Sequence, residues 1–181
     1  MAETMRPATA PLLRREAMWR LARGAGVTAP VMAFLEGRVS ALPRGEETDI
    51  AVLHAAIALE HEAIAVYDIG LKRSLFPAGL RSYAVEFRGD HLGHRDTQIA
   101  IAEERGSRPP EARAGYDFAP LTNGDAVLRQ AVAIELAAQD AYTALISQIR
   151  TRDYLLSAAF ILVDEVRHLT VWRRVLGLKI Y

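Results

Sequence analysis

The sequence contains no cysteine among its 181 residues. This absence excludes disulfide bonds, thiolate nucleophiles and the cysteine-ligated zinc and iron–sulfur sites. A net charge is also absent, because 22 Lys and Arg balance 22 Asp and Glu, so the composition does not indicate a nucleic-acid partner. No apolar run reaches the roughly 18 residues that a membrane-spanning helix needs. Any chemistry must therefore come from carboxylates, five histidines, hydroxyls and tyrosines.

The composition that is present is that of a folded globular protein. Hydrophobic residues make up 51% of the chain and charged residues 24%, and this balance is ordinary for a domain with a full-sized core. The length is that of one domain with a short extension. We expect an N-terminal extension over residues 1–46 and one helical domain over residues 47–181.

The extension can be interpreted in two ways. Arg14 and Arg15 precede a mildly apolar stretch over residues 25–35, and this order resembles a degenerate twin-arginine export signal. Pro30 interrupts the apolar stretch, and two short amphipathic helices packed on the domain would have the same composition. We favour the second interpretation and hence a cytoplasmic location, with periplasmic export as the alternative.

Four stretches carry apolar residues at steps of three and four, the period of an amphipathic helix. They cover residues 50–71, 80–101, 128–149 and 155–175. Short breaks join the first two stretches and the last two, whereas the segment from Gly106 to Gly124 is long enough to cross a bundle. The sequence therefore predicts an all-α, antiparallel four-helix bundle with a long crossover between its second and third helices. Thr151 or Asp153 is expected to cap the fourth helix.

Polar residues recur between the two halves of the chain at an almost constant separation. Glu60 and Tyr67 return 75 residues later as Glu135 and Tyr142, and Asp90-His91-x-x-His94 returns 74 residues later as Asp164-Glu165-x-x-His168. The two halves thus behave as copies of one helical hairpin. A pseudo-twofold bundle built from them brings both polar sets to the middle of one core.

Six of these polar residues occupy positions where the helical pattern predicts leucine or isoleucine. They are Glu60, His91, His94, Glu135, Glu165 and His168. Buried carboxylates without a basic partner must either take up protons through raised pKa values or lie against cations. Mixed oxygen and imidazole ligands suit iron, manganese or zinc better than calcium or magnesium.

Other polar residues are placed to support such a site. Tyr67 and Tyr142 lie two helical turns beyond the lone glutamates and can hydrogen-bond a carboxylate or a metal-bound solvent molecule. Asp90 and Asp164 each precede a histidine by four residues, and an aspartate so placed can accept the second ring N–H of a ligating histidine across the bundle. His54 and His61 lie off the polar stripe, and the site does not need them. Gly89 and Gly93, inside the second helix, can allow close helix approach or leave room for a ligand.

At this level of detail the chain resembles the ferritin-like di-iron and di-manganese proteins over residues 48 to 177. That family takes one glutamate from each of two helices and Glu-x-x-His from the other two. Glu60 and Glu135, each followed seven residues later by tyrosine, are similar to the lone glutamates of rubrerythrin- and bacterioferritin-type members. The resemblance implies that Glu60 and His94 hold one metal and Glu135 and His168 the other, with Glu165 bridging and His91 as an extra ligand.

One position departs from the family pattern. His91 stands where the resemblance implies a second bridging glutamate, and a neutral imidazole normally binds one metal. Three outcomes remain open: a dimetal site with one carboxylate bridge, a site for a single metal ion, or an altered site that binds weakly.

The resemblance implies a non-haem iron centre, with two iron ions expected and manganese or zinc as alternatives. The expected function is oxidative, with dioxygen or peroxide as the oxidant, as in ferroxidases and peroxidases. The alternative is a non-catalytic ferritin-like stress or structural protein with an altered or single-metal site. The expected partners are metal ions and the oxidant, with no nucleic acid and no membrane span, and a homo-oligomer, a dimer in preference to a closed shell.

Overall fold

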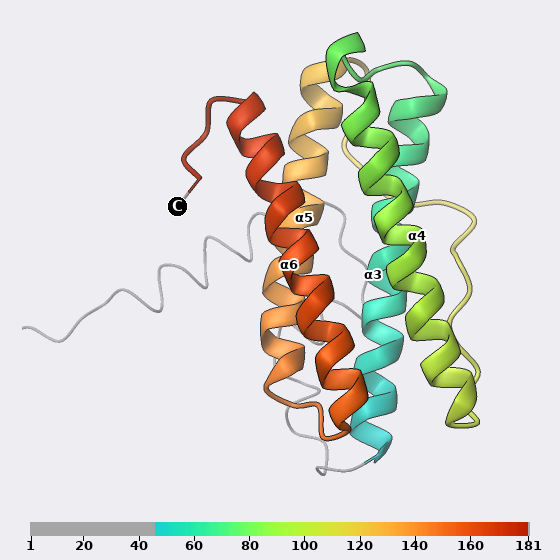
Figure 1. Cartoon of the computed structure of the whole chain (residues 1–181). Coiled ribbons are helices and arrows are strands. Elements are labelled where there is room, and N and C mark those ends of the chain that lie inside the picture. The colour runs from blue at the N-terminus through green and yellow to red at the C-terminus, as the bar shows by residue number, and fades with distance from the viewer. Residues whose placement is uncertain (1–45, 181) are drawn as a thin grey trace, which may run out of the picture.

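The computed structural model describes residues 46–180, which form four α-helices and one short 3-10 helix and contain no β-strand (Figure 1). In chain order the elements are α3 (Glu46–Lys72), η2 (Ala78–Leu80), α4 (Arg81–Glu104), α5 (Gly124–Ile146) and α6 (Arg152–Val175). The all-α four-helix prediction is therefore confirmed. The predicted N-terminal extension and its export-signal alternative lie outside the described residues, apart from Glu46 at the start of α3.

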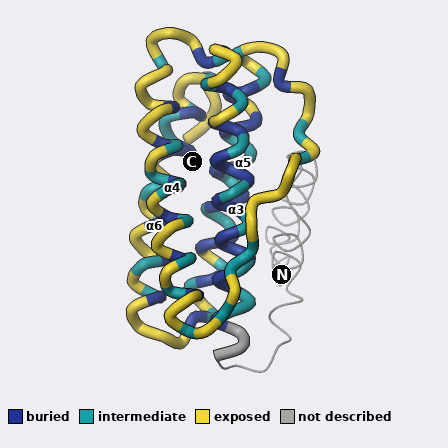
Figure 2. The backbone as a smooth tube through the Cα atoms, turned by 90° about the vertical axis from the view of Figure 1, so that its right-hand side faces the viewer, coloured by how far each residue is buried: buried dark blue, intermediate teal, exposed yellow. Residues whose placement is uncertain are grey.

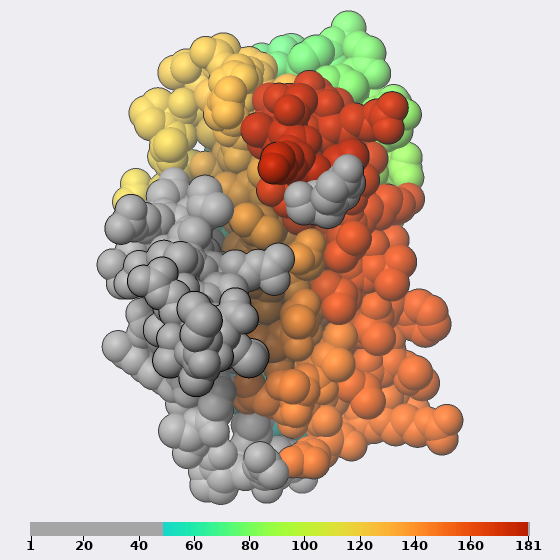
Figure 3. All heavy atoms as spheres, turned by 90° about the vertical axis from the view of Figure 1, so that its left-hand side faces the viewer, coloured from blue at the N-terminus to red at the C-terminus, as the bar shows by residue number. Residues whose placement is uncertain are grey.

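The helices form a bundle in which α3 packs against α4 and α5, and α6 packs against α4 and α5. Contacts across the core show that α3 and α5 are antiparallel, because the earlier residue of each helix meets the later residue of the other. Tyr67 of α3 contacts Glu135, and Tyr142 of α5 contacts Glu60. With two short hairpin turns, this arrangement makes α4 and α5 run in the same direction, as the predicted long crossover requires. Figure 3 shows α5 and α6 side by side on one face of the bundle.

The crossover between α4 and α5, yellow in Figure 1, is held against α3. The Nε2 atom of His54 lies 2.8 Å from the Ser107 hydroxyl, and that of His61 lies 3.2 Å from the Pro110 carbonyl oxygen. Phe118 packs on the small cluster formed by α3 and α5. These contacts explain the two histidines that lie off the polar stripe, because both tie the crossover to the bundle.

The start of α6 differs from the sequence prediction. Thr151 occupies the N-cap position, but its side chain makes no capping hydrogen bond, and Asp153 lies inside the first turn. Instead, the buried carboxylate of Asp49 on α3 accepts hydrogen bonds from the Arg150 and Thr151 amides, each at 3.2 Å, and from the Thr151 hydroxyl at 3.1 Å. A carboxylate from a different helix therefore holds this turn, and sequence spacing within α6 cannot indicate it.

Glycines have different roles at different positions of the bundle. A Cβ atom at Gly70 of α3 would lie 2.4 Å from the Phe76 ring and 2.8 Å from Val127. The close packing of these two side chains on α3 therefore needs glycine there. Cβ atoms at Gly89 and Gly93 would meet nothing within 4 Å, and both glycines lie on the exposed side of α4. Neither glycine therefore allows close approach of another of the described helices, one of the two roles considered for these positions.

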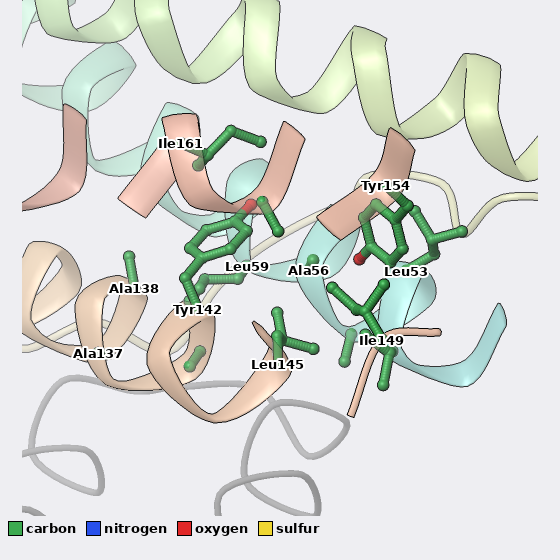
Figure 4. Packing of buried hydrophobic residues seen from close by; sticks show 14 residues of the cluster. Leu53, Ala56, Leu59, Ala137, Ala138, Tyr142, Leu145, Ile149, Tyr154 and Ile161 are labelled. Atoms are coloured by element: carbon green, nitrogen blue, oxygen red, sulfur yellow. The ribbon is translucent and has the colours of Figure 1, made fainter. Parts of the chain in front are cut away.

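The apolar core consists of two main clusters, one toward each end of the bundle. One contains Tyr142 and Tyr154 with leucines and alanines of α3, α5 and α6 (Figure 4). The other contains Tyr67, Phe87 and Trp172. Figure 2 shows that buried positions line the inner side of every helix, whereas α4 and α6 expose their outer sides. The polar residues predicted for the core lie between the two clusters.

The segment Asp49–Lys72 of α3 has the length and hydropathy of a membrane-crossing helix, but 67% of its most apolar window is buried inside the bundle. A core helix of this kind passes the same test, so the feature is weak evidence for a membrane span.

Candidate metal centre

All six polar residues predicted for the core are buried, and they meet at the middle of the bundle. Each helix contributes at least one of them, because the positions fall on the inner face of its 3.6-residue period. The exposed fraction is 8% for His94 and 1% or less for the other five. Charged side chains are rarely buried to this extent unless they are paired or bind a ligand. The six side chains therefore interact with one another or with a ligand.

The six residues form two overlapping groups whose ligand atoms lie within 4.8 Å of one another. One group is Glu60, His91, His94 and Glu165, and the other is His91, Glu135, Glu165 and His168. His91 and Glu165 belong to both groups. The arrangement therefore has two halves that share a middle, as the internal repeat predicted.

The two outer histidines are oriented in the same way in the two halves. His94 turns its Nδ1 atom inward, 3.1 Å from Glu165 Oε1, and its Nε2 atom outward, 3.3 Å from Asp164 Oδ2. His168 likewise has Nδ1 3.4 Å from Glu135 Oε2 and Nε2 3.0 Å from Asp90 Oδ2. Each aspartate lies on the opposite helix from its histidine. An aspartate that accepts a hydrogen bond from Nε2–H keeps the proton on Nε2 and leaves Nδ1 free to bind a metal.

His91 lies between the two lone glutamates. Its Nδ1 atom is 2.8 Å from Glu60 Oε2, and its Nε2 atom is 3.3 Å from Glu135 Oε1. Burial alone would lower the pKa of His91, but the carboxylates of Glu165 and Glu135 raise it well above its usual value. One ring nitrogen therefore faces each half of the centre.

Both lone glutamates are held by tyrosines from the facing helix. The Tyr142 hydroxyl donates a hydrogen bond to Glu60 Oε1 at 2.5 Å, and the Tyr67 hydroxyl donates one to Glu135 Oε1. Burial, reinforced by these carboxylates, raises the pKa of both tyrosines well above its usual value. Both therefore stay protonated and act as donors at neutral pH.

Two further residues behind the tyrosines were missed by the sequence reasoning. The Gln98 side-chain amide donates to the Tyr142 hydroxyl, and Trp172 Nε1 donates to the Tyr67 hydroxyl at 2.7 Å. The 74-residue repeat could have indicated the pair, because it relates position 98 to position 172.

The carboxylates of the centre differ in their affinity for protons. Burial, together with the charges of Glu60 and Glu135, raises the pKa of Glu165 well above its usual value despite the opposing effect of His91. Burial also disfavours ionisation of Glu135, but His91 and His168 hold its pKa below the usual range. Burial alone would lower the pKa of His168, but the combined effect of Glu135 and Glu165 is larger, and the pKa is raised above its usual value.

Several of these atoms make no hydrogen bond of good geometry among the described residues, although Nδ1 of His94 and Nδ1 of His168 each lie within 3.4 Å of a carboxylate oxygen. They are both carboxylate oxygens of Glu165, Oε2 of Glu135, and Nδ1 of His94 and His168. An unsatisfied buried polar atom is costly, and five of them pointing into one centre require an explanation. Carboxylate oxygens and imidazole nitrogens are the donor atoms that bind iron, manganese or zinc, so these residues fit a transition-metal site.

Comparisons with known proteins agree with this architecture. The chain matches the model of the ferritin-like domain family over residues 48–178, and it belongs to that family. It is similar to the conserved hypothetical protein Rv2844 from Mycobacterium tuberculosis, whose crystal structure is known. The two chains are 29% identical with a TM-score of 0.68, and the similarity covers 72% of this chain and 98% of that one. No curated protein matches the chain.

Proposed function

We propose that the centre binds redox-active metal ions, two irons in the expected case, and that the protein oxidises iron or another substrate with dioxygen or peroxide. The observation that carries the proposal is the pair of overlapping four-residue groups, in which the unsatisfied carboxylate and imidazole atoms face one another. Membership of the ferritin-like domain family supports metal binding of this kind.

Within this proposal each half of the chain supplies one metal position. Glu60 and His94 hold the first ion, Glu135 and His168 hold the second, and Glu165 lies between them. Iron bound there supplies the electrons that reduce the oxidant. Manganese held by the same residues would supply different redox chemistry, and zinc would supply none.

The chain's own residues orient the ligands and keep water away. Tyr142 and Tyr67 hold the carboxylates of Glu60 and Glu135 in place. The aspartates fix which nitrogen of each outer histidine faces inward. The apolar clusters on both sides exclude bulk solvent, and a dry surrounding strengthens electrostatic interactions inside the centre.

His91 makes the two metal positions unequal. A neutral imidazole has one unprotonated nitrogen, so His91 can donate a ligand atom to only one half at a time. The centre then has three carboxylates for two divalent ions, and the second ion is less well neutralised than the first. We therefore expect two binding steps of different affinity.

The same observation favours one alternative function. Because His91 lies within hydrogen-bond distance of both Glu60 and Glu135, it can hold the two glutamates together in place of a second cation. The protein would then be a non-catalytic ferritin-like stress or structural protein that binds one ion or none.

Metal content separates the two functions. Protein purified without chelator should carry metal approaching two ions per chain, and the Fe(II)-loaded protein should oxidise iron in air. Glu165→Gln should reduce the metal content strongly, because Glu165 belongs to both groups. Glu62→Gln is the matched control, since Glu62 is buried but belongs to neither group. A metal-free protein that takes up no Fe(II), Mn(II) or Zn(II) would refute the metal-centre proposal.

The expected dimer and the cytoplasmic location stay predictions. Light scattering after size-exclusion chromatography tests the first, and cell fractionation with N-terminal sequencing of the purified protein tests the second.

A further inference from the structure

Arg167 lies next to His168 on α6 but directs its side chain across the bundle surface to α4. Its guanidinium contacts three carboxylates: Nη1 is 3.0 Å from Glu86 Oε1, and Nη2 is 2.5 Å from Asp90 Oδ2 and 3.4 Å from Asp164 Oδ1. The Arg167 side chain is 45% exposed. Arg167 therefore lies outside the buried centre, and its ion pairs are with Glu86, Asp90 and Asp164 and not with the six core polar residues.

Two of these three carboxylates are the partners of the outer histidines. Asp90 faces Nε2 of His168, and Asp164 faces Nε2 of His94. One guanidinium nitrogen thus contacts both aspartates, although they belong to different helices and to different halves of the centre. The contact with Asp90 is a charge-assisted hydrogen bond, which orients a carboxylate more firmly than a neutral one, whereas the contact with Asp164 is an ion pair at 3.4 Å.

An aromatic contact reaches the same place from the side. The Arg167 guanidinium carbon is 5.7 Å from the centroid of the Phe87 ring, and that ring stacks on the His168 imidazole with centroids 4.0 Å apart. The Phe87 ring therefore lies between the Arg167 guanidinium and the His168 imidazole and contacts both. This packing restricts the orientation of His168 in addition to the hydrogen bond from Asp90.

The internal repeat contains no second copy of this arginine. Position 167 corresponds to position 93 in the first half of the chain, and that residue is Gly93. A glycine has no side chain that could reach the aspartates. The two halves of the centre consequently depend on the same arginine.

We propose that Arg167 is a positioning residue for both outer histidines, acting through Asp90 and Asp164. The proposal rests on the proposed metal centre. By fixing the two aspartates it keeps Nδ1 of His94 and Nδ1 of His168 directed inward, so that both metal positions are preformed.

The sign of the effect distinguishes positioning from simple electrostatics. A positive charge near a cation site weakens metal binding, so removing it would strengthen binding if charge alone mattered. Positioning predicts the opposite. Removing the carboxylate partner of a ligating histidine typically weakens metal affinity by about 10–100-fold. We expect about tenfold for Arg167→Ala, because Arg167 acts on the histidines only through the two aspartates.

The experiment titrates metal-free protein with Co(II), followed by its visible absorption, and with Mn(II), followed by calorimetry. Arg167→Ala should weaken both binding steps. Arg167→Lys should restore them only in part, since an ammonium group lacks the planar fork of a guanidinium. Arg129→Ala is the matched control, because it removes an exposed Arg–Asp pair on α5 without a contact to the centre. The melting temperature of the metal-free Arg167→Ala protein should change by only a few degrees, because exposed ion pairs add little stability.

A second measurement needs no metal. In ¹⁵N spectra of the histidine rings, recorded at a pH where the imidazoles are neutral, His94 and His168 should carry the proton on Nε2 in the wild type and a mixture of tautomers in Arg167→Ala. Unchanged or tighter metal binding, weakening of only one step, or unchanged tautomers would each overturn the proposal. Failure of the wild type to bind metal would refute the metal centre instead, and the tautomer measurement would still decide the role of Arg167.

Discussion

Replacing His91 by glutamate should have opposite effects on the metal-free and the metal-bound protein. In the metal-free state His91 is fully buried and lies within hydrogen-bond distance of Glu60 and Glu135. A glutamate there would be a fourth buried carboxylate beside Glu60, Glu135 and Glu165. Breaking a buried ion pair so that charge is left uncompensated costs about 3–5 kcal/mol, which corresponds to a fall in melting temperature of about 10 °C.

In the metal-bound state the same carboxylate faces two cations. Two unit charges about 4 Å apart attract by about 4 kcal/mol at an effective dielectric constant near 20. The loss of the imidazole ligand and the displacement of any proton held by the buried carboxylate offset much of this. We expect a net gain of about 1–3 kcal/mol, or roughly tenfold to a hundredfold tighter binding, mainly of the second ion.

Thermal unfolding with and without Mn(II) and calorimetric titration would measure both effects. His91→Gln is the control, because it removes the imidazole and adds no charge. The reasoning would be refuted if metal-free His91→Glu were as stable as the wild type. It would also be refuted if its metal affinity did not exceed that of His91→Gln.

Three further predictions concern protons and glycines. Because the pKa values of His91, His168 and Glu165 are raised, these groups keep their protons to higher pH than usual, and a bound metal competes with those protons. Metal affinity should therefore increase with pH through the neutral range, with proton release in weakly buffered solution; a pH-independent affinity would contradict this. Gly93→Ala should stabilise the protein by about 1 kcal/mol, since helix propensity improves and the added methyl group enters open space; a lower denaturant midpoint would count against it. Gly70→Ala should destabilise by about 1–3 kcal/mol because its Cβ collides with Phe76 and Val127, and an unchanged midpoint would contradict that packing.

The sequence by itself determined the helices and the positions of the six core polar residues. A helix that buries one face repeats its apolar residues every three to four positions, so a glutamate or histidine in that series is recognisable without coordinates. The 74- and 75-residue separations then indicated that both polar sets lie at the same level of the bundle. The domain boundary after residue 46 stays a prediction.

Only the tertiary structure decided how these side chains face one another. Sequence spacing places His91 on the inner face of α4, but its position between Glu60 and Glu135 depends on how three helices pack. The open space beside Gly93 was equally hidden, because periodicity shows that α4 turns this position outward but not whether a neighbouring segment lies there.

The same limit applies to the residues around the centre. Gln98 and Trp172 each bond a tyrosine from another helix, and Arg167 reaches from α6 to both aspartates. Periodicity identifies the side of a helix that is buried, because burial depends on the chain's own repeat. Hydrogen-bond partners depend on the relative placement of helices that are far apart in sequence, and that placement is set by packing of the whole core.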